Sequence, residues 1–231
     1  MYPMLEECPE LAKACPVLNE MLRTGVTLSP TGDRVPMTSG IIPLYAEALY
    51  KAILKFSPAV VVEIGMAFGV STLAILSALK ENNPAAKLIS IDPEQSKDWK
   101  DCGRHAVARA GLADQHIMIE NFDYLTLPTL CEKKLLIDFA YIDGWHTFDY
   151  TLLDWWYIDK MLKVGGIVGF NDCGWPAVEK VIKFVLSHRN YKEISVGLPM
   201  VKWDQAPQRC EDRYFIKVDN TEPRWDFFAE F

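Results

Sequence analysis

Two short stretches of this sequence carry residues whose types and spacing suit chemistry. The first is a glycine turn after a β-branched run, Glu63-Ile64-Gly65-Met66-Ala67-Phe68-Gly69. The second is polar and comes in two pieces, since Asp143 and His146 follow one apolar run and an Asn171-Asp172 pair follows the next. A glycine turn before a helix offers backbone N–H groups to a nucleotide, and a histidine has a pKa suited to proton transfer. We therefore expect a nucleotide-type ligand and a group that moves protons.

The spacing of the glycines narrows the kind of nucleotide. A dinucleotide fingerprint places glycines at the first, third and sixth positions of the turn. Counted from Gly65, the third position is Ala67 and the sixth is Val70, so the pattern of a pyrophosphate site is broken twice. A phosphate-binding loop is also excluded, because no Gly-Lys-Ser or Gly-Lys-Thr follows. What remains is an acidic residue, Glu63, two positions before a Gly-x-x-x-Gly turn.

These residues need strands and helices to position them. The glycine turn joins a strand from Val60, with the composition of a strand buried on both faces, to a helix with Leu73 and Leu76 on one side. From Ala59 onward strand and helix patterns alternate, which predicts a parallel sheet with helices on both faces. Further strands are expected at 87–91, 116–120, 137–142, 167–170, 193–196 and 213–218, and helices at 41–56, 99–110, from 147 and at 177–188.

An aspartate ends the second of these strands. Asp92 follows the strand at 87–91, where an acidic side chain is placed to accept both ribose hydroxyls of a nucleoside held at the glycine turn. The alternative is an aspartate that caps a helix or closes a turn. The company of Glu63 and Gly65 upstream favours the ligand role.

The polar residues of the second stretch are expected at one edge of the sheet. The carboxyl ends of central strands face the cleft of such a fold. The fourth strand ends at Asp143 and the fifth at Asn171 and Asp172, which brings these residues and His146 to the same edge. His146 also precedes a helix that begins near Thr147, so a capping or structural histidine is the alternative.

Composition excludes several classes of partner. The formal charge of −7 and the pI near 5.2 argue against a nucleic-acid surface. The acidic N-terminus lacks the pattern of a signal peptide, and no apolar run approaches the ~20 residues that span a bilayer. The six cysteines form no Cys-x-x-Cys pair and are expected as free thiols in a reducing cytoplasm, rather than as a zinc site or disulfides. We therefore expect a cytoplasmic protein with no nucleic-acid or membrane partner.

The length predicts one domain with an extension. A chain of 231 residues, half of them hydrophobic, can bury one full core. Residues 1–57 are interpreted as a helical N-terminal extension, which either caps the ligand cleft or packs against the sheet edge. Within it the segment 27–40 is predicted as a loop because it is rich in proline and glycine. Residues 58–231 form the predicted ligand-binding domain.

The motifs together resemble a known family. The turn from Glu63 to Gly69 resembles motif I of the class I S-adenosylmethionine (SAM) methyltransferases. Ile-Asp-Gly-x-His at 142–146, Leu-Lys-x-Gly-Gly at 162–166 and the 171–172 pair look like the bacterial sugar and small-molecule O-methyltransferases of the Methyltransferase-24 type, and more distantly the catechol and caffeoyl-CoA O-methyltransferases. The resemblance spans roughly Val60 to Leu186. It implies an α/β, Rossmann-like, doubly wound and mostly parallel seven-stranded sheet that ends in an antiparallel hairpin.

The resemblance also implies a cofactor site. Phe122 and Asp123, after the third strand, match the position that holds the adenine, and Trp145 is an aromatic residue beside the cleft. The residues implied to bind SAM are Glu63, Gly65, Met66, Ala67, Phe68, Gly69, Ser71, Thr72, Asp92, Phe122, Asp123, Asp143, Trp145 and His146.

Relatives with this pattern hold Mg²⁺, and here Asp143, Asn171 and Asp172 would be its ligands. Oxygen ligands suit a hard ion that lowers the pKa of the acceptor hydroxyl. This sequence departs from the family in having Asn171 where an acidic residue is usual, which removes one negative charge. Without the metal, His146 becomes the general base, and Asp143 and His146 are the predicted catalytic residues.

The implied function is transfer of the SAM methyl group to a small-molecule acceptor, most simply to a hydroxyl oxygen. Two alternatives stay open. One is a SAM-consuming cyclisation or lyase reaction that releases methylthioadenosine, and the other is a non-catalytic SAM-binding protein. The loop at 197–211 is expected to line the acceptor pocket, and the apolar tail at 225–231 to pack on its own domain or on a second subunit of a homodimer.

Overall fold

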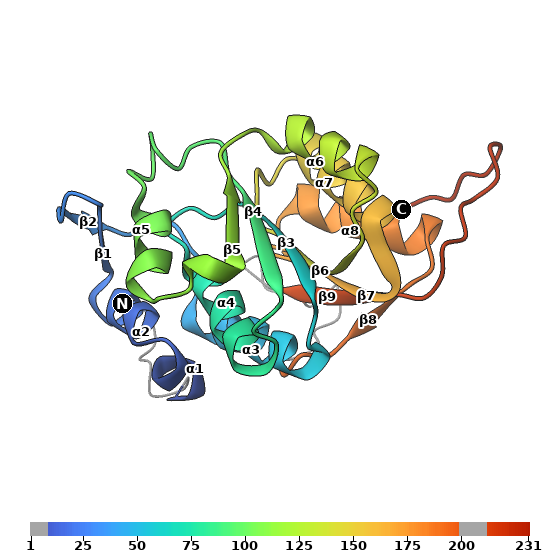
Figure 1. Ribbon diagram of the computed structural model, residues 1–231. Coiled ribbons are helices and arrows are strands. Elements are labelled where there is room, and N and C mark those ends of the chain that lie inside the picture. Colours follow the sequence, from blue (N-terminus) through green and yellow to red (C-terminus); the bar gives the residue numbers. More distant parts are fainter. Residues whose placement is uncertain (1–8, 199–211) are drawn as a thin grey trace. The chain divides into compact units, whose positions relative to one another are not determined.

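The computed structural model of the protein describes residues 9–198 and 212–231 (Figure 1). The chain divides into two compact units, Met1–Phe122 and Asp123–Phe231. Cys8, Cys210 and most of the loop predicted to line the acceptor pocket lie outside the described residues. The predicted extension at 1–57 falls within the first unit.

The main sheet contains each strand that the sequence predicts, although the strands expected at 167–170 and 193–196 have different bounds. They are β3 (Val60–Ile64), β4 (Lys87–Ile91), β5 (His116–Ile119), β6 (Ile137–Ile142), β7 (Leu162–Phe170), β8 (Tyr191–Ile194) and β9 (Arg213–Lys217). Their order is β5-β4-β3-β6-β7-β9-β8. The pairs β3–β4, β4–β5 and β6–β7 are parallel, whereas β9 is antiparallel to both β7 and β8. The predicted fold class, a Rossmann-like α/β sheet with an antiparallel C-terminal hairpin, is confirmed.

The N-terminal part of the first unit is helical with one small hairpin. Its helices are α1 (Pro9–Ala14), α2 (Pro16–Thr24) and α3 (Pro43–Phe56). Strands β1 (Val26–Leu28) and β2 (Arg34–Pro36) pair antiparallel within the segment predicted as a loop. The sequence does not predict this hairpin, because the cross-strand partners become neighbours only once the turn between them has formed. Helix α3 begins two residues later than predicted, since Pro43 holds Ile42 in an extended conformation.

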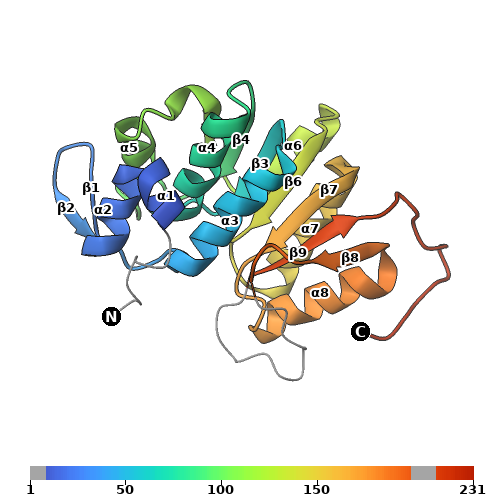
Figure 2. The same cartoon turned by 90° about the horizontal axis from the view of Figure 1, so that it is seen from below.

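Helix α4 (Val70–Asn82), which follows the glycine turn, is buried along both of its sides. Every residue from Val70 to Leu79 is buried, whereas the sequence predicts one apolar side. The second side is covered by α3, which lies beside α4 (Figure 2), and by α1 and α2. A Cβ on Gly40 would lie 3.1 Å from Val70 Cγ2, so the segment before α3 closely approaches the start of α4. The extension therefore packs on the helix that begins at the glycine turn.

Helix α5 (Cys102–Arg109) is shorter than the predicted helix at 99–110. Lys100 (φ 52°) and Asp101 (φ 54°) adopt the left-handed conformation, which interrupts a right-handed helix. Gly111 follows with φ 65°, a conformation that commonly ends a helix. The segment between Asp92 and Cys102 is thus an irregular loop rather than part of a helix.

The second unit carries the helices α6 (Asp123–Glu132), α7 (Phe148–Met161) and α8 (Pro176–His188). Helices α6 and α7 lie side by side (Figure 1). Strand β7 begins five residues earlier than predicted, so Gly165 and Gly166 lie within the strand. Gly165 has φ 83°, and the register of β7 against β6 shifts between Ile137 and Phe139. The strand therefore contains a bulge-like irregularity at the two glycines.

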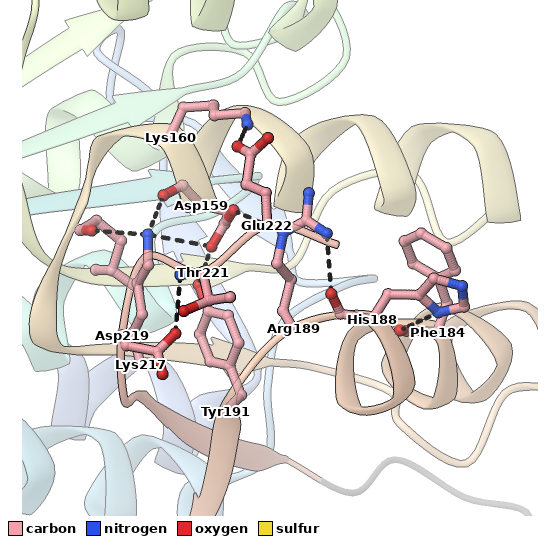
Figure 3. Close-up of polar contacts among 11 residues, drawn as sticks. Asp159, Lys160, Phe184, His188, Arg189, Tyr191, Lys217, Asp219, Thr221 and Glu222 are labelled. Carbon is pink, nitrogen blue, oxygen red and sulfur yellow. Dashed lines mark hydrogen bonds and ion pairs between the residues drawn. The ribbon is translucent and has the colours of Figure 1, made fainter. Parts of the chain in front are cut away.

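A buried ion cluster joins α7 to the C-terminal hairpin (Figure 3). Asp159 Oδ1 accepts a hydrogen bond from the Tyr191 hydroxyl at 2.7 Å and lies 3.2 Å from Lys217 Nζ. Arg189 Nε lies 3.5 Å from Asp159 Oδ2. Lys217 Nζ also donates to the carbonyl oxygens of Asp159 and Leu162. The charges in this cluster are paired, although Arg189 Nε has no hydrogen-bond partner among the described residues, so the cluster fixes the hairpin rather than offering a reactive group.

The C-terminal tail packs on the second unit. The His188 ring stacks on Phe184 at 4.3 Å and meets the edges of Phe227 and Phe231 at 5.4 and 5.9 Å. Glu222, three residues before the tail, pairs with Lys160 (Figure 3). The prediction that the tail packs on its own domain is therefore confirmed for these residues, while Trp225 is 94% exposed. No helix in residues 9–198 and 212–231 has the length and apolar character needed to cross a bilayer.

Candidate functional site

The glycine turn, residues 65–69, adopts backbone conformations that depend on its sequence. Gly65 and Gly69 have φ of 85° and 86°, values that glycine reaches without strain. Ala67 between them has φ 44°, which is unusual for a residue with a Cβ. The Gly69 N–H donates to the Met66 carbonyl at 2.7 Å, and α4 begins at the next residue. Ala67, which stands where a dinucleotide-binding turn has its second glycine, thus adopts a left-handed conformation without being glycine.

Glu63 lies beneath the glycine turn and is completely buried. Its Oε2 accepts hydrogen bonds from Thr72 Oγ1 at 2.7 Å and Ser90 Oγ at 2.6 Å. Burial raises the pKa of Glu63 to about 6, against the opposing effect of the Ser71, Ser90 and Thr72 hydroxyls. Its Oε1 is buried without a hydrogen-bond partner among the described residues. The Glu63–Thr72 hydrogen bond therefore links the strand before the turn to the helix after it, and Glu63 Oε1 is left unpaired among the described residues.

Asp92 is hydrogen-bonded to the glycine turn itself. Its Oδ2 accepts from Met66 N at 3.1 Å, from Ala67 N at 2.8 Å and from Gln95 Nε2 at 3.1 Å. Its Oδ1 accepts from Glu94 N at 2.9 Å. Because a carboxylate oxygen has two lone pairs, Oδ2 is saturated and Oδ1 has room for one further donor. The sequence places Asp92 correctly beside the turn but does not reveal that it binds the backbone of the turn.

The aromatic residues near the turn differ in exposure. Phe68 is buried and packs edge-on against Trp99, with ring centroids 5.1 Å apart. Phe122 at the end of the first unit is 40% exposed, which leaves ring surface for a ligand. Trp145 in the second unit is 69% exposed. Of these predicted cofactor residues, Phe68 thus supports the loop after Asp92, whereas Phe122 and Trp145 expose aromatic surface.

Asp123 begins α6 in the second unit and is nearly buried. Its Oδ1 accepts from the Tyr124 backbone N–H at 2.6 Å. Burial raises its pKa, and burial together with the Asp123 charge raises the pKa of Asp154 on α7 well above the ordinary value. Its predicted contact with adenine would therefore use a carboxyl group in an acidic, water-poor environment.

The second unit brings three of the predicted polar residues together after β6 and β7. His146 Nε2 lies 3.3 Å from Asp172 Oδ2 and 3.5 Å from Asp143 Oδ1. The His146 ring also meets Trp175 edge-on at 5.2 Å. We call these four residues the His146 cluster. Burial lowers the pKa of His146 below 6.5, and Asp172 acts in the opposite direction. The imidazole is therefore neutral near pH 7 and has two carboxylates beside it that would stabilise a bound proton.

Asn171 is turned away to a separate buried network. Its Nδ2 donates to Asp212 Oδ1 at 2.9 Å, while the Tyr141 and Tyr214 hydroxyls donate to Asp212 Oδ2 at 2.8 and 3.2 Å. Burial raises the pKa of Asp212 to about 7, although these three donors favour its charged form. The next residue, Asp172, has φ 52°. Asp212 thus anchors the strand end from which Asp172 reaches His146.

This arrangement does not fit the predicted Mg²⁺ site. The Asp143 and Asp172 carboxylates approach an imidazole nitrogen, and the amide of Asn171 is bound to Asp212. Magnesium requires near-octahedral oxygen ligands at about 2.0–2.1 Å. Within residues 9–198 and 212–231, no three or more His, Cys, Asp or Glu side chains are arranged to hold a metal ion. The His146 cluster therefore suits proton transfer better than metal binding.

Comparison with protein families covers the glycine turn and most of the His146 cluster. Residues 62–173 match the family model described as a methyltransferase domain. This region is therefore similar to a methyltransferase domain. The match runs from the strand before the glycine turn to the residue after Asp172, so it includes nearly every residue discussed above. The predictions of a class I methyltransferase resemblance and of a transferase activity are confirmed.

Solved structures similar to the chain share its fold. The O-methyltransferase TomG from Streptomyces achromogenes, involved in tomaymycin synthesis and solved with SAM, has a TM-score of 0.63 at 16% identity over 90% of this chain and 89% of that one. The SAH-bound methyltransferase PaMTH1 from Podospora anserina has 0.67 at 16% over 95% and 99%. An O-methyltransferase from Bacillus cereus in complex with SAH has 0.62 at 13% over 93% and 92%. A search of curated proteins gives no match.

Two residues of the methyltransferase domain and its surroundings escape sequence reasoning. Gln95 lies three residues after Asp92, and its side chain returns to the glycine turn. Asp212 precedes β9 and its side chain reaches Asn171. Neither belongs to a motif, and the only signal in the sequence is that each is a polar residue next to a predicted strand or turn. Their hydrogen-bond partners are 28 and 41 residues away in the sequence, so these contacts are seen only in the folded structure.

Proposed function

We propose that the chain binds SAM and transfers its methyl group to a hydroxyl oxygen of a small molecule. One observation carries the proposal: a single methyltransferase domain, residues 62–173, contains both the glycine turn and the His146 cluster apart from Trp175. The structures of similar fold include O-methyltransferases solved with SAM or SAH. The proposal assigns cofactor binding to the first unit and proton transfer to the second.

The first unit offers groups that suit SAM. Helix α4 begins directly after the glycine turn, and the first N–H groups of a helix favour an anion such as the cofactor carboxylate. Asp92 Oδ1 has capacity for one ribose hydroxyl, and the unpaired Oε1 of Glu63 is a buried acceptor. Phe122 offers exposed ring surface to the adenine. Bound SAM supplies a methyl group on a positively charged sulfur, which an oxygen nucleophile can attack.

The second unit provides the proton acceptor. A neutral His146 can take the proton from the acceptor hydroxyl as the oxygen–methyl bond forms, and the carboxylates at 3.3 and 3.5 Å stabilise the resulting imidazolium. Alignment of the two reactants supplies much of the remaining rate, on the order of 7–11 kcal/mol. Exposed Trp145 and Trp175 offer aromatic faces, which attract a cation without competing as nucleophiles.

Mg²⁺ is the alternative way to activate the hydroxyl. The orientation of Asp143 and Asp172 toward His146 favours the histidine, and so does the engagement of Asn171 by Asp212. We therefore propose that His146 is the general base and that Mg²⁺ is not required. Activity that is lost with EDTA and restored by Mg²⁺ would reverse this assignment.

The test is mass spectrometry of SAM incubated with excess purified protein, with and without EDTA or Mg²⁺, followed by a screen of catechols, phenols and sugars. Retention of intact SAM by the protein alone, and SAH formation only with a hydroxyl acceptor, is the expected result. Release of methylthioadenosine without an acceptor would support the cyclisation or lyase alternative. Retained SAM with no product from any acceptor would favour a binding protein, and no retention would overturn the proposal.

Two further predictions concern the whole protein. A cytoplasmic location is consistent with the free thiols of Cys15, Cys102, Cys131 and Cys173. A homodimer is consistent with the exposed Trp225 on the tail. Light scattering on the full chain and on a chain ending at residue 223 tests the second: a dimer that becomes a monomer on truncation is the expected result, and a monomeric full chain contradicts it.

A further inference from the structure

Both backbone polar groups of Ala67 are hydrogen-bonded to side chains. Its N–H donates to Asp92 Oδ2 at 2.8 Å and its carbonyl oxygen accepts from Gln95 Nε2 at 2.7 Å. Gln95 Nε2 also donates to Asp92 Oδ2 at 3.1 Å, which closes a ring of hydrogen bonds around Ala67. Since Ala67 has φ 44°, this ring stabilises a conformation that alanine seldom adopts.

The orientation of the Gln95 amide is determined by its partners. The Ala67 carbonyl and Asp92 Oδ2 only accept hydrogen bonds, so the amide nitrogen rather than the amide oxygen must face them. Gln95 has no exposed surface, and its Oε1 is buried without a partner among the described residues. A buried amide with one unpaired oxygen is costly, so packing and the two bonds of Nε2 must hold it in place.

Helix α5 provides that packing through Gly103. A Cβ at this position would lie 2.7 Å from the Ala67 carbonyl oxygen and 2.9 Å from Gln95 Oε1, which is closer than real Cβ atoms approach. Only glycine therefore allows α5 to approach both the glycine turn and the Gln95 amide. The ring around Ala67 is closed on this side by backbone, and Gln95 has no room for another rotamer toward α5.

We propose that Gln95 is a positioning residue of the cofactor site. By holding the Ala67 carbonyl and Asp92 Oδ2, it fixes the backbone of the glycine turn and leaves Asp92 Oδ1 as the oxygen with capacity for a ribose hydroxyl. The inference rests on the proposed SAM-binding function. It assigns to Gln95 no contact with the cofactor, only the preorganisation of the groups that make contact.

The chain offers a matched control in Gln115. This residue is also buried in the first unit, and its Nε2 also donates to two acceptors, the carbonyl oxygens of Asn83 and Ala86 at 3.1 Å each. Neither acceptor belongs to the glycine turn. Gln95→Met and Gln115→Met each remove two hydrogen bonds donated by Nε2 and nearly conserve side-chain volume. One of the two acceptors of Gln95 is the Asp92 carboxylate, whereas both acceptors of Gln115 are carbonyl oxygens, so both variants are expected to lower stability, Gln95→Met the more.

Calorimetric titration of the full chain with SAM separates the two. Loss of preorganisation in Gln95→Met is expected to raise the Kd for SAM about tenfold, the effect of one lost hydrogen bond to a charged group. Gln95→Glu is expected to weaken binding further, because it places a second carboxylate beside Asp92. Gln115→Met is expected to leave the Kd within about twofold of the unmodified chain, since no bond near the turn is lost.

The outcomes distinguish the inference from the function on which it rests. If the unmodified chain does not bind SAM, the proposed function fails. If it binds and a folded Gln95→Met variant binds equally well, or Gln115→Met weakens binding as much, the role of Gln95 is wrong. Should both Gln95 variants fail to fold, NMR of the unmodified chain decides: a Gln95 side-chain amide signal that shifts on SAM addition, while that of Gln115 does not, supports the inference, and an unchanged signal overturns it.

Discussion

The glycine turn and the His146 cluster use polar residues in opposite ways. Around the turn, Glu63, Asp92 and Gln95 are 0%, 4% and 0% exposed, and Asp92 and Gln95 hydrogen-bond its backbone. In the cluster the side chains of His146 and Asp143 are 19% and 18% exposed, whereas Asp172 is buried, with 9% of the residue exposed. The buried groups fix the shape of a binding site, whereas the partly exposed groups are able to change charge. The difference separates residues that preorganise a ligand site from residues that react.

The energetics of the two regions follow from this difference. A buried carboxylate such as Asp92 is stable because four hydrogen-bond donors face its oxygens, and removing any donor leaves the charge less compensated. His146 has no such network. The two nearby carboxylates stabilise its imidazolium form once the ring has accepted a proton. We therefore expect substitutions at the turn to change affinity and stability, and substitutions in the cluster to change turnover.

The largest effect is expected from His146→Ala. Loss of the general base should lower kcat about 100- to 10,000-fold for the acceptor found in the screen, the typical contribution of such a group. The Kd for SAM should stay within about twofold, because the turn is intact. Stopped assays of product formation together with calorimetry measure the two quantities.

The control for this variant is His105→Ala on α5, which is expected to retain full activity. His105 belongs to α5 in the first unit, whereas the His146 cluster belongs to the second unit. A His146→Ala enzyme with kcat within about tenfold of the unmodified enzyme would show that His146 is a structural histidine, since general bases contribute more than this.

Asp92→Ala is expected to have the next largest effect and tests the turn. It leaves the N–H groups of Met66 and Ala67 without their acceptor and removes the oxygen proposed to bind ribose. The Kd for SAM should rise about 100-fold, the upper range for hydrogen bonds to a charged group. Asp98→Ala in the same loop, where the side chain is 58% exposed, is the control and should bind normally. Equal SAM affinity of both variants would contradict the role proposed for Asp92 in the cofactor site.

The sequence predicts the placement of these residues better than their partners. The bounds of β4 and β6 agree with prediction, because short apolar segments between turns are local signals. The gathering of Asp143, His146 and Asp172 follows from a general rule about the carboxyl ends of parallel strands. Local pattern and topology thus account for the fold and for the position of the candidate site.

The hydrogen-bond partners depend on contacts that no local pattern contains. The Asp92 side chain binds amides 25 and 26 residues away, and Tyr141 reaches Asp212 across 71 residues. Lys100 and Asp101 adopt the left-handed conformation within the predicted helix, at the end of a loop whose Gln95 side chain contacts the glycine turn. The direction of the Asn171 amide likewise depends on Asp212, which lies outside every motif.

Glu63→Gln tests the cost of burying charge under the turn. The pKa of Glu63 is about 6 in the folded protein against an ordinary 4.5, so the folded state binds more protons between these values. Stability should therefore fall as pH rises through this window, by about 2 kcal/mol in total for one and a half pKa units. Glutamine is neutral throughout and can still accept from Thr72 and Ser90. The variant should become more stable relative to the unmodified chain, by this amount, between pH 4 and pH 7 in urea unfolding.

The smallest predicted effect concerns Ala67 and asks whether the turn sacrifices stability for a fixed shape. A left-handed alanine costs about 1–2 kcal/mol and a glycine loses about 0.4–1 kcal/mol more entropy on folding, so Ala67→Gly should raise the free energy of unfolding by up to about 1 kcal/mol. SAM binding should nevertheless weaken slightly, because glycine widens the range of conformations that the ring around Ala67 must restrict. Gly25→Ala is the reverse control, since Gly25 has φ 66° with open space at its Cβ and should lose stability without any change in SAM affinity. If Ala67→Gly instead gains both stability and affinity, the left-handed alanine has no role in preorganising the turn, and the contrast between a fixed binding region and a reactive cluster rests on Asp92 and Gln95 alone.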